Sequence, residues 1–291
     1  MHHHGINFHL FADDTQIYIS TSFPDIAAAS ECIERCIQDI KTWMTLNFLK
    51  LNQDKTELLL IHSRYSKVDR SNFTVNVAGT PISPSTTARN IGAVIDSNLT
   101  LECHVNQICR SSYLYLRKIG AIRKYLTTTV TVRLVHAFIM SKLDHLNALL
   151  LNLPDRLVEK LQRIQNTAAR IVSRTKRSEH ITPVLAKLHW LPVRARIVFK
   201  VCLLVYRSFN GQAPAYITDI LETYKPSRNL RSGDDGLLLT VPRTRTSFYG
   251  SRAFSAGAPV LWNSLPLEVR SSASEYTFRK QLKTNLFKQY F

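Results

Sequence analysis

Two adjacent aspartates, Asp13 and Asp14, stand between apolar flanks in the stretch FHLFADDTQIYIS, residues 8–20. Side by side, two carboxylates repel each other unless a cation or several hydrogen-bond donors offset their charge. Hard divalent cations such as Mg²⁺ bind carboxylate oxygens, so the pair is a candidate metal site. Aspartate is also common in tight turns, where it accepts hydrogen bonds from nearby backbone N–H groups. The pair by itself leaves a metal site and a plain hairpin turn as alternatives.

The neighbouring residues predict a β-hairpin that carries both aspartates at its turn. Residues 15–20 alternate apolar and polar side chains with a period of two, and residues 8–11 form the preceding strand. A long helix is expected over residues 23–52, with isoleucines at helical spacing and Pro24-Asp25 at its start. Strands are expected at 55–63 and 88–97, and a hairpin at 73–84 around Ala78-Gly79-Thr80. The first hundred residues are therefore expected to form an α+β layer.

Beyond residue 100 the pattern becomes helical, with helices expected at 103–126, 128–153 and 155–174. Three helices of this size can form a small bundle. The third has an apolar stripe on one side and cations on its other faces, and further cations follow its end. We expect these cations to be solvated and able to contact phosphates; they are Arg156, Lys160, Arg163, Arg170, Arg174, Lys176 and Arg177.

The last third of the chain mixes several kinds of element. Residues 181–224 predict helices interrupted at Pro183, Pro192 and Asn210-Gly211, and residues 225–236 predict a charged loop. Residues 237–266 indicate short strands and turns, and 275–288 a basic helix. Three segments are therefore expected: an α+β segment at 1–100, a helical segment at 101–178 and a basic segment at 179–291.

Charge is distributed unevenly along the chain. Residues 1–100 contain 8 Lys and Arg against 10 Asp and Glu, a net charge of −2, whereas residues 101–291 carry +19. A basic region of this size favours a polyanion as partner, and nucleic acid lets many phosphates be neutralised at once. A merely soluble basic surface, or one that lies on an anionic membrane, is the alternative. Trp190, Trp262 and the tyrosines of SSYLYLRK, residues 111–118, either stack on bases or belong to the core.

The composition predicts a folded protein of an intracellular, reducing compartment. Hydrophobic residues make up 45% and charged residues 20% of the 291 residues, as in ordinary globular proteins. The five cysteines are odd in number and scattered, which argues against a disulfide framework. Neither a signal peptide nor a membrane-spanning segment is recognisable, so we expect a nuclear and cytoplasmic protein without a membrane partner.

Taken in order, these segments resemble the palm domain of reverse transcriptases from LINE-type (non-LTR) retrotransposons of the jockey-like lineages. The resemblance is carried by Phe11-Ala12-Asp13-Asp14 and, one helix later, by Leu51-Asn52-Gln53-Asp54-Lys55-Thr56-Glu57. Residues 90–96, NIGAVID, resemble the family's primer-grip segment, and the basic helices resemble its thumb. Residues 190–217 and 252–266 resemble the C-terminal extension of such elements, so the resemblance covers nearly the whole chain.

The resemblance implies candidate catalytic residues and a two-metal Mg²⁺ site. It makes Asp13 the principal metal ligand and Asp14 a supporting one, and it places Lys55 near the incoming triphosphate. For Lys55 a solvated lysine at the start of a strand is the equal alternative. The implied partners are an RNA template, a DNA primer and, in a full-length enzyme, deoxynucleoside triphosphates.

One part of the family's pattern is absent from this chain. The family's site needs another aspartate on a strand far upstream of the hairpin, and its fingers lie upstream as well. We therefore expect the C-terminal fragment of an RNA-directed DNA polymerase, inactive alone. The alternative is a non-catalytic, basic nucleic-acid-binding protein derived from such an element.

Overall fold

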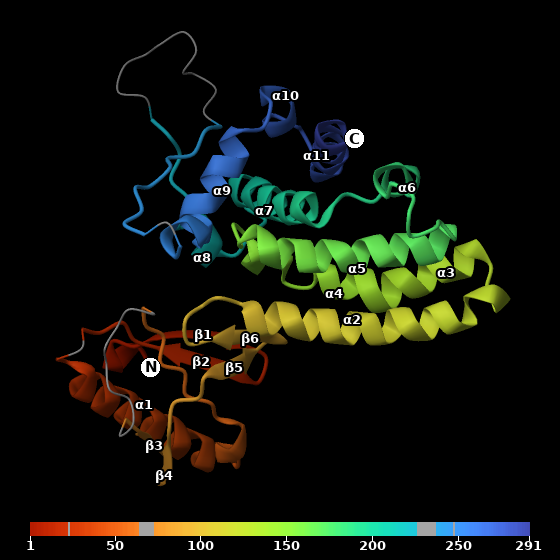
Figure 1. The fold of residues 1–291 in the computed structure, drawn as a ribbon. Helices are drawn as coiled ribbons and strands as arrows, with labels where there is room; N and C mark the ends of the chain where they lie inside the picture. Colours follow the sequence, from red (N-terminus) through yellow and green to blue (C-terminus); the bar gives the residue numbers. More distant parts are fainter. Residues whose placement is uncertain (23, 64–72, 226–236, 247) are drawn as a thin grey trace. The chain divides into compact units, whose positions relative to one another are not determined.

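The computed structural model describes residues 1–22, 24–63, 73–225, 237–246 and 248–291 (Figure 1). The chain forms two compact units, Met1–His104 and Val105–Phe291. Unit 1 combines helix with small antiparallel sheets and unit 2 is mostly helical, so the α+β class is confirmed at this coarse level. The expected division between residues 178 and 179 falls inside unit 2.

The aspartate stretch folds into a two-stranded antiparallel hairpin. Strand β1 spans Asn7–Phe11 and β2 spans Asp14–Tyr18, with Phe11 paired to Asp14 and Asn7 to Tyr18. Ala12 takes a left-handed backbone conformation, with φ of 54°, to close the two-residue turn. A short 3-10 turn, η1 at His2–His4, precedes the hairpin. The predicted hairpin is therefore present, but Asp14 begins the second strand instead of lying in the turn.

Two further hairpins complete the strands of unit 1 among the described residues. Strands β3, Val75–Val77, and β4, Thr80–Ile82, form the predicted hairpin around Ala78-Gly79. Strands β5, Thr87–Asn90, and β6, Ala93–Asp96, turn at Ile91-Gly92, where both residues have positive φ. Two consecutive positive φ angles are typical of the tight hairpin turn that matches strand twist. The prediction of one strand over 88–97 is therefore wrong, because the chain reverses at Gly92.

Helix α1 spans Ile26–Leu46 and packs against β3. Ile37, Val75 and Val77 form a small buried cluster, with Ile17 and Ile33 among the side chains around it. The helix ends earlier than the predicted Asn52 because Phe48 turns left-handed, with φ of 57°. The N–H of Leu49 then bonds the carbonyl of Met44, and the N–H of Phe48 that of Thr45, a Schellman ending.

The buried strand predicted at 55–63 is not formed. Residues 53–55 make a 3-10 turn, η2, and only a single parallel bridge joins Leu59 to Ser85. Leu58, Leu59 and Leu60 are half-buried. An apolar run predicts burial on both faces, whereas here Leu58 packs beside the cluster of Ile37, Val75 and Val77 while all three leucines keep part of their surface exposed.

Unit 2 begins with a long helix, α2 at Glu102–Ile122, in agreement with the prediction. Before it, the Asp96 carboxylate accepts the N–H groups of Thr100 and Leu101 at 2.9 and 2.7 Å. The expected helix at 128–153 ends early, because Leu146 adopts a left-handed conformation with φ of 53°. The elements here are η3 (Arg123–Tyr125), α3 (Thr128–Val135), a π-helical turn η4 (His136–Met140), α4 (Ser141–Asp144) and η5 (Asn147–Leu150).

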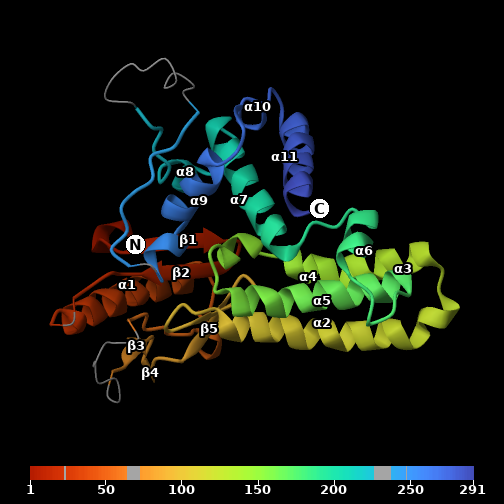
Figure 2. The same ribbon diagram turned by 45° about the horizontal axis from the view of Figure 1, so that its top comes forward.

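Helix α5, Asp155–Ser173, confirms the third predicted helix and buries its apolar stripe. It runs parallel to α2 (Figure 2), because Lys160 near the start of α5 bonds Asn106 near the start of α2, and Ile171 near the end of α5 bonds Arg123, the residue that follows α2. The later elements are α6 (Thr182–Lys187), α7 (Val193–Phe209), α8 (Ala215–Thr218), η6 (Gly250–Arg252), α9 (Phe254–Asn263), α10 (Leu267–Arg270) and α11 (Glu275–Tyr290).

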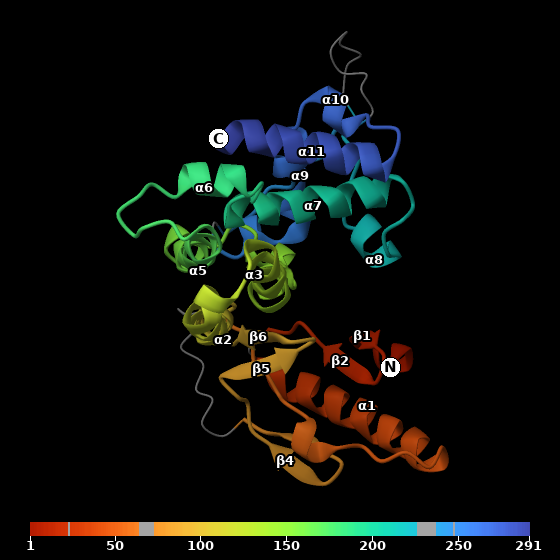
Figure 3. The same ribbon diagram turned by 90° about the vertical axis from the view of Figure 1, so that its right-hand side faces the viewer.

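The core of unit 2 is centred on α7. Figure 3 shows α11 alongside α7, and both α9 and α11 contact it. Tyr206 stacks on Phe278 at 4.3 Å between ring centroids, and Trp262 lies 5.8 Å from Phe278. Residues 254–263 were predicted as turns and short strands, but they are helical, with Pro259 inside the helix. Among the described residues, each helix is too short or too polar to cross a bilayer.

Candidate functional site

The two predicted metal ligands lie at the exposed tip of the β1–β2 hairpin. Asp13 occupies the turn and Asp14 is the first residue of β2, opposite Phe11. Both side chains are exposed, and neither carboxylate bonds to any residue that the structure describes. The hairpin thus presents two adjacent carboxylates to solvent, with their ligand oxygens unoccupied by protein donors.

The strand alternation of β2 fixes which way this pair is oriented. Side chains along a strand alternate between faces, so Asp14 and Gln16 share one face and Ile17 takes the other. Ile17 packs against the cluster of α1 and β3, whereas Gln16 Oε1 accepts a hydrogen bond from Asn90 Nδ2 at 2.8 Å. The face that carries Asp14 is therefore the face that meets the end of β5.

The second sequence box, residues 51–57, is anchored to both other hairpins. Gln53 Nε2 donates to the carbonyl of Ala78 at 3.2 Å, and Gln53 Oε1 accepts from Thr80. Glu57 Oε2 accepts the backbone N–H of Arg89 at 2.7 Å. Lys55 is exposed at the end of η2, and the structure forms no ion pair between it and Asp13 or Asp14.

The three segments that carry the resemblance therefore meet at two consecutive residues. Gln16 from the aspartate hairpin bonds Asn90, and Glu57 from the second box bonds Arg89. Sequence reasoning missed Gln16, Gln53 and Glu57 as positioning residues. The signal that could have indicated Glu57 was its place within the second box.

The donor type at the hairpin suits Mg²⁺, but the donor number is short. Carboxylate oxygens are the ligands that this ion prefers, and it also keeps bound water and substrate phosphate. Within the described ranges no group of three His, Cys, Asp or Glu side chains is placed to hold a metal. Asp13 and Asp14 supply two carboxylates, so we derive no chemical step through a metal from this chain alone.

The predicted cations of α5 differ in what they contact. Arg156 and Arg163 are exposed, and Arg163 makes only a loose ion pair with Glu159, at 3.9 Å. Surface pairs of this kind contribute little. Lys160 is half-buried and donates to Asn106 Oδ1 at 3.0 Å, which ties α5 to α2. Arg156 and Arg163 thus face solvent as expected, while Lys160 also has a packing role.

Arg170 organises the basic loop that follows α5. Its guanidinium donates to the carbonyls of Lys176, Arg177 and Glu179, the last at 2.8 Å. The Glu179 carboxylate accepts the N–H of Lys176 at 2.9 Å. Arg174 turns left-handed, with φ of 58°, and donates weakly to the carbonyl of Arg123. The guanidinium of Arg170 is therefore hydrogen-bonded to the loop. The loop in turn exposes the side chains of Lys176 and Arg177 to solvent.

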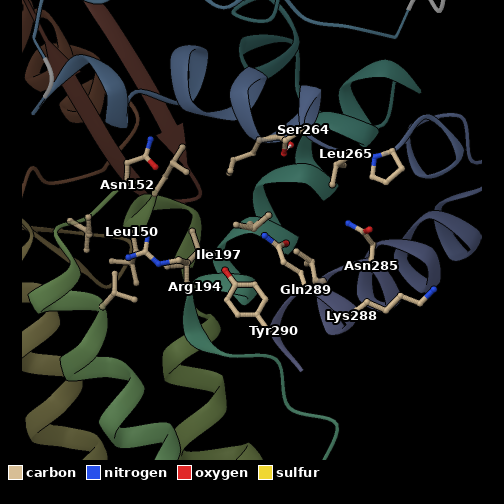
Figure 4. A pocket seen from close by; sticks show the side chains of 17 residues that line it. Leu150, Asn152, Arg194, Ile197, Ser264, Leu265, Asn285, Lys288, Gln289 and Tyr290 are labelled. Carbon is tan, nitrogen blue, oxygen red and sulfur yellow. Dashed lines mark hydrogen bonds between the residues drawn. The ribbon is translucent and has the colours of Figure 1, made fainter. Parts of the chain in front are cut away.

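A cavity of about 570 Å³ in unit 2 is separate from these residues (Figure 4). Leucines from residues 150–153 and Ile197 supply apolar walls, and polar groups come from the end of α11. Arg194, on its wall, forms an ion pair with Asp155. All residues that the sequence analysis proposed for chemistry or nucleic-acid binding lie outside its lining.

Comparisons with protein-family models, with curated proteins and with solved structures found no match to this chain.

Proposed function

We propose that this chain is the C-terminal portion of an RNA-directed DNA polymerase of a LINE-type retrotransposon. Unit 1 would be part of its palm, and unit 2 its thumb and C-terminal extension. The full enzyme would extend a DNA primer on an RNA template inside the cell, in the nucleus and cytoplasm. This portion alone would bind nucleic acid but not polymerise.

The observation that carries the proposal is the meeting of three sequence-distant segments at Arg89 and Asn90. A box of an aromatic residue, alanine and two aspartates is a short motif, and short motifs have a high false-positive rate. Here Gln16 and Glu57 connect that box and the second box to neighbouring residues of one hairpin. Convergence of this kind favours one functional site over three unrelated local resemblances.

Exposed apolar side chains support the proposal that unit 1 is an incomplete domain. Leu10, Phe11 and Tyr18 of the hairpin are more than half exposed, and Phe48, after α1, is fully exposed. Large exposed apolar surfaces mark places where another part of a protein packs. An upstream segment with the remaining strands of a palm would cover them and bring the additional aspartate.

In the complete enzyme, Asp13 and Asp14 would be two of the carboxylates that hold Mg²⁺, which would supply charge stabilisation for phosphoryl transfer. The contribution of this chain would be positional, because Asp13 and Asp14 are held by a two-residue turn between paired strands. Carboxylates on a rigid hairpin need little reorganisation before they bind a cation. Lys55, on a turn fixed by Gln53, would be available to a triphosphate.

The test is primer extension on poly(rA)–oligo(dT), with this chain alone and with the chain joined to an upstream palm segment. The chain alone is expected to incorporate no nucleotide, and the joined protein to be active. In the joined protein, Asp13→Asn should lower the rate at least about 100-fold, a common cost of removing one preorganised electrostatic group. Asp54→Asn, which removes the charge of another exposed acid in unit 1, is the matched control and should be neutral.

Robust Mg²⁺-dependent incorporation by the chain alone, abolished by Asp13→Ala, would overturn the proposed incompleteness of the site. Near-normal turnover of Asp13→Asn in the joined protein would mean that the aspartate pair is only a turn. In either case, the catalytic part of the proposal would need revision while nucleic-acid binding by unit 2 would stand or fall separately.

A second candidate, a non-catalytic nucleic-acid-binding protein, is favoured by one further observation. Residues 103–143 contain seven Lys and Arg and not a single Asp or Glu. A salt titration of binding to a single strand by the full chain distinguishes this candidate from a merely soluble basic protein. If about five phosphates are contacted, log K should fall against log[salt] with a slope of about −3.5. A flat response would assign the charge to solubility.

A further inference from the structure

A stacked aromatic pair with two lysines lies on the surface formed by α2, η4 and α4. The rings of Tyr115 and Phe138 are nearly parallel, at 11°, with centroids 4.8 Å apart. The ammonium groups of Lys142 and Lys118 lie over the Tyr115 ring, 4.8 and 5.9 Å from its centroid. We call Tyr115, Phe138, Lys118 and Lys142 the aromatic platform.

The π-helical turn η4 explains why Phe138 takes part in this platform. The next two residues, Ile139 and Met140, are buried, at 0% and 2% exposure, whereas Phe138 is 39% exposed. A π turn is rare within α-helices and is frequently found at functional sites. Here it places two side chains in the core while it leaves an aromatic ring at the surface, stacked on a residue of another helix.

The sequence segment that carries the platform is basic, with seven Lys and Arg at residues 103–143. No acidic residue occurs between Glu102 and Asp144 in the sequence. Asp144, the acid on α4, is held by the guanidinium of Arg196, whose Nε donates to Oδ1 at 2.8 Å. Among the described residues, Lys118 and Lys142 form no ion pair and contact the ring of Tyr115, and a cation over a ring still attracts anions.

We propose that the aromatic platform binds single-stranded nucleic acid, with an unpaired base stacked on Phe138 and the flanking phosphates on Lys118 and Lys142. The proposal rests on the proposed function, because it names the strand that unit 2 would bind and where. A ring with an exposed face stacks on any base, so recognition would not depend on sequence. The ammonium groups of Lys118 and Lys142 favour an anionic ligand. The aromatic ring of Phe138 favours a polyanion that carries planar bases.

The experiment compares two strands of equal charge. Fluorescence anisotropy of the full chain is measured with oligo(dT) and with an abasic strand of the same length, about 12 nucleotides. Base stacking on one aromatic residue is expected to make oligo(dT) bind about tenfold more tightly than the abasic strand. Phe138→Leu should remove this preference and leave the abasic strand's affinity unchanged, and Phe138→Tyr should keep the preference.

Matched controls separate the platform from the general charge. Tyr276→Leu removes an exposed aromatic side chain of α11 and should leave the preference intact. The double variant Lys118→Gln with Lys142→Gln should weaken the binding of both oligonucleotides. It should also flatten the slope of log K against log[salt] by about 1.4. Lys280→Gln with Lys283→Gln removes the same charge from α11 and should flatten it less. Unchanged circular dichroism spectra establish that each variant is folded.

Equal binding of the two strands by the wild-type chain, with a steep salt dependence, would overturn the platform and leave the proposed function standing. Absence of binding to either strand would overturn both. A Phe138→Leu variant that binds oligo(dT) like the wild type would also refute the platform. Anionic vesicles bound tightly by the wild type and weakly by Phe138→Leu would assign the platform to a membrane and contradict the proposal.

Discussion

Replacing Arg123 by methionine should destabilise unit 2 more than any loss of a surface cation. The Arg123 side chain is 8% exposed and donates to the carbonyls of Ile171, Leu126 and Val172 at 2.8, 2.7 and 2.9 Å. Burial and then the neighbouring Arg174 lower the pKa of Arg123, yet a guanidinium stays charged near neutral pH. Its partners are carbonyl dipoles, without a carboxylate among the described residues.

The expected loss in the free energy of unfolding follows from the carbonyls that the substitution leaves without a hydrogen-bond donor. Ile171 and Val172 lie in the last turn of α5, where backbone carbonyls lack an intrahelical partner. A buried acceptor left without its donor costs about 1–3 kcal/mol. Three such acceptors, partly relieved by water, give about 3–5 kcal/mol for Arg123→Met. For a unit of this size that corresponds to a fall in Tm of roughly 10 °C.

Thermal unfolding followed by circular dichroism measures this fall. Arg117→Met, an exposed arginine of α2, is the matched control and should change the unfolding free energy by less than about 0.5 kcal/mol. Arg123→Lys keeps the charge but has one nitrogen to reach three carbonyls, so an intermediate loss is expected. If Arg123→Met unfolds within 1 °C of the wild type, these hydrogen bonds do not hold η3 against the end of α5.

Three further predictions use other features of unit 2. The hydrogen bond from Arg207 holds the pKa of Glu275 below its ordinary range. The pair therefore contributes fully to the free energy of unfolding above the ordinary glutamate pKa, and this contribution is lost as the pH falls through the lower folded value. Below about pH 4, the free energy of unfolding, measured by chemical denaturation, should fall more steeply in the wild type than in Glu275→Gln. Burial raises the pKa of the Cys202 thiol to about 12, so mass spectrometry should find Cys202 unalkylated by iodoacetamide at about pH 8 while the exposed Cys103 reacts. Gly257→Ala should lower Tm although alanine favours helices, because its Cβ would lie 2.7 Å from a neighbouring leucine methyl; a raised Tm would contradict the packing.

Turn chemistry decided how much of the fold could be predicted. The hairpin at Ala78-Gly79 was predictable because glycine interrupts an alternating pattern. Gly92 closes the same kind of turn, but the preceding Ile91 is β-branched, and such a residue at positive φ is an outlier that the sequence does not indicate. Leu146 likewise ends a helix without any sequence signal, since leucine is a strong helix former.

The candidate site was predictable only where it is local. Asp13 and Asp14 come from consecutive residues, so the period of their flanks sufficed to place them at the tip of a hairpin. The bond between Gln16 and Asn90 joins residues 74 positions apart, and a single sequence contains no signal for such a pair. Arg170 is a second example. Helical spacing predicted that its side chain faces solvent, but the loop that follows α5 folds back so that its carbonyls accept hydrogen bonds from the Arg170 guanidinium.

The anchoring of the basic loop by Arg170 has a consequence for the speed of binding. Ordering a backbone costs about 1–2 kcal/mol per residue, and a disordered basic loop would meet that cost on contact with its partner. Here the carbonyls of residues 176, 177 and 179 are fixed during folding, so only the side chains of Lys176 and Arg177 lose freedom later. Under the proposed function, association with nucleic acid would then involve no folding step of this loop. Its rate constant should approach the range of electrostatically steered encounters and fall steeply with ionic strength.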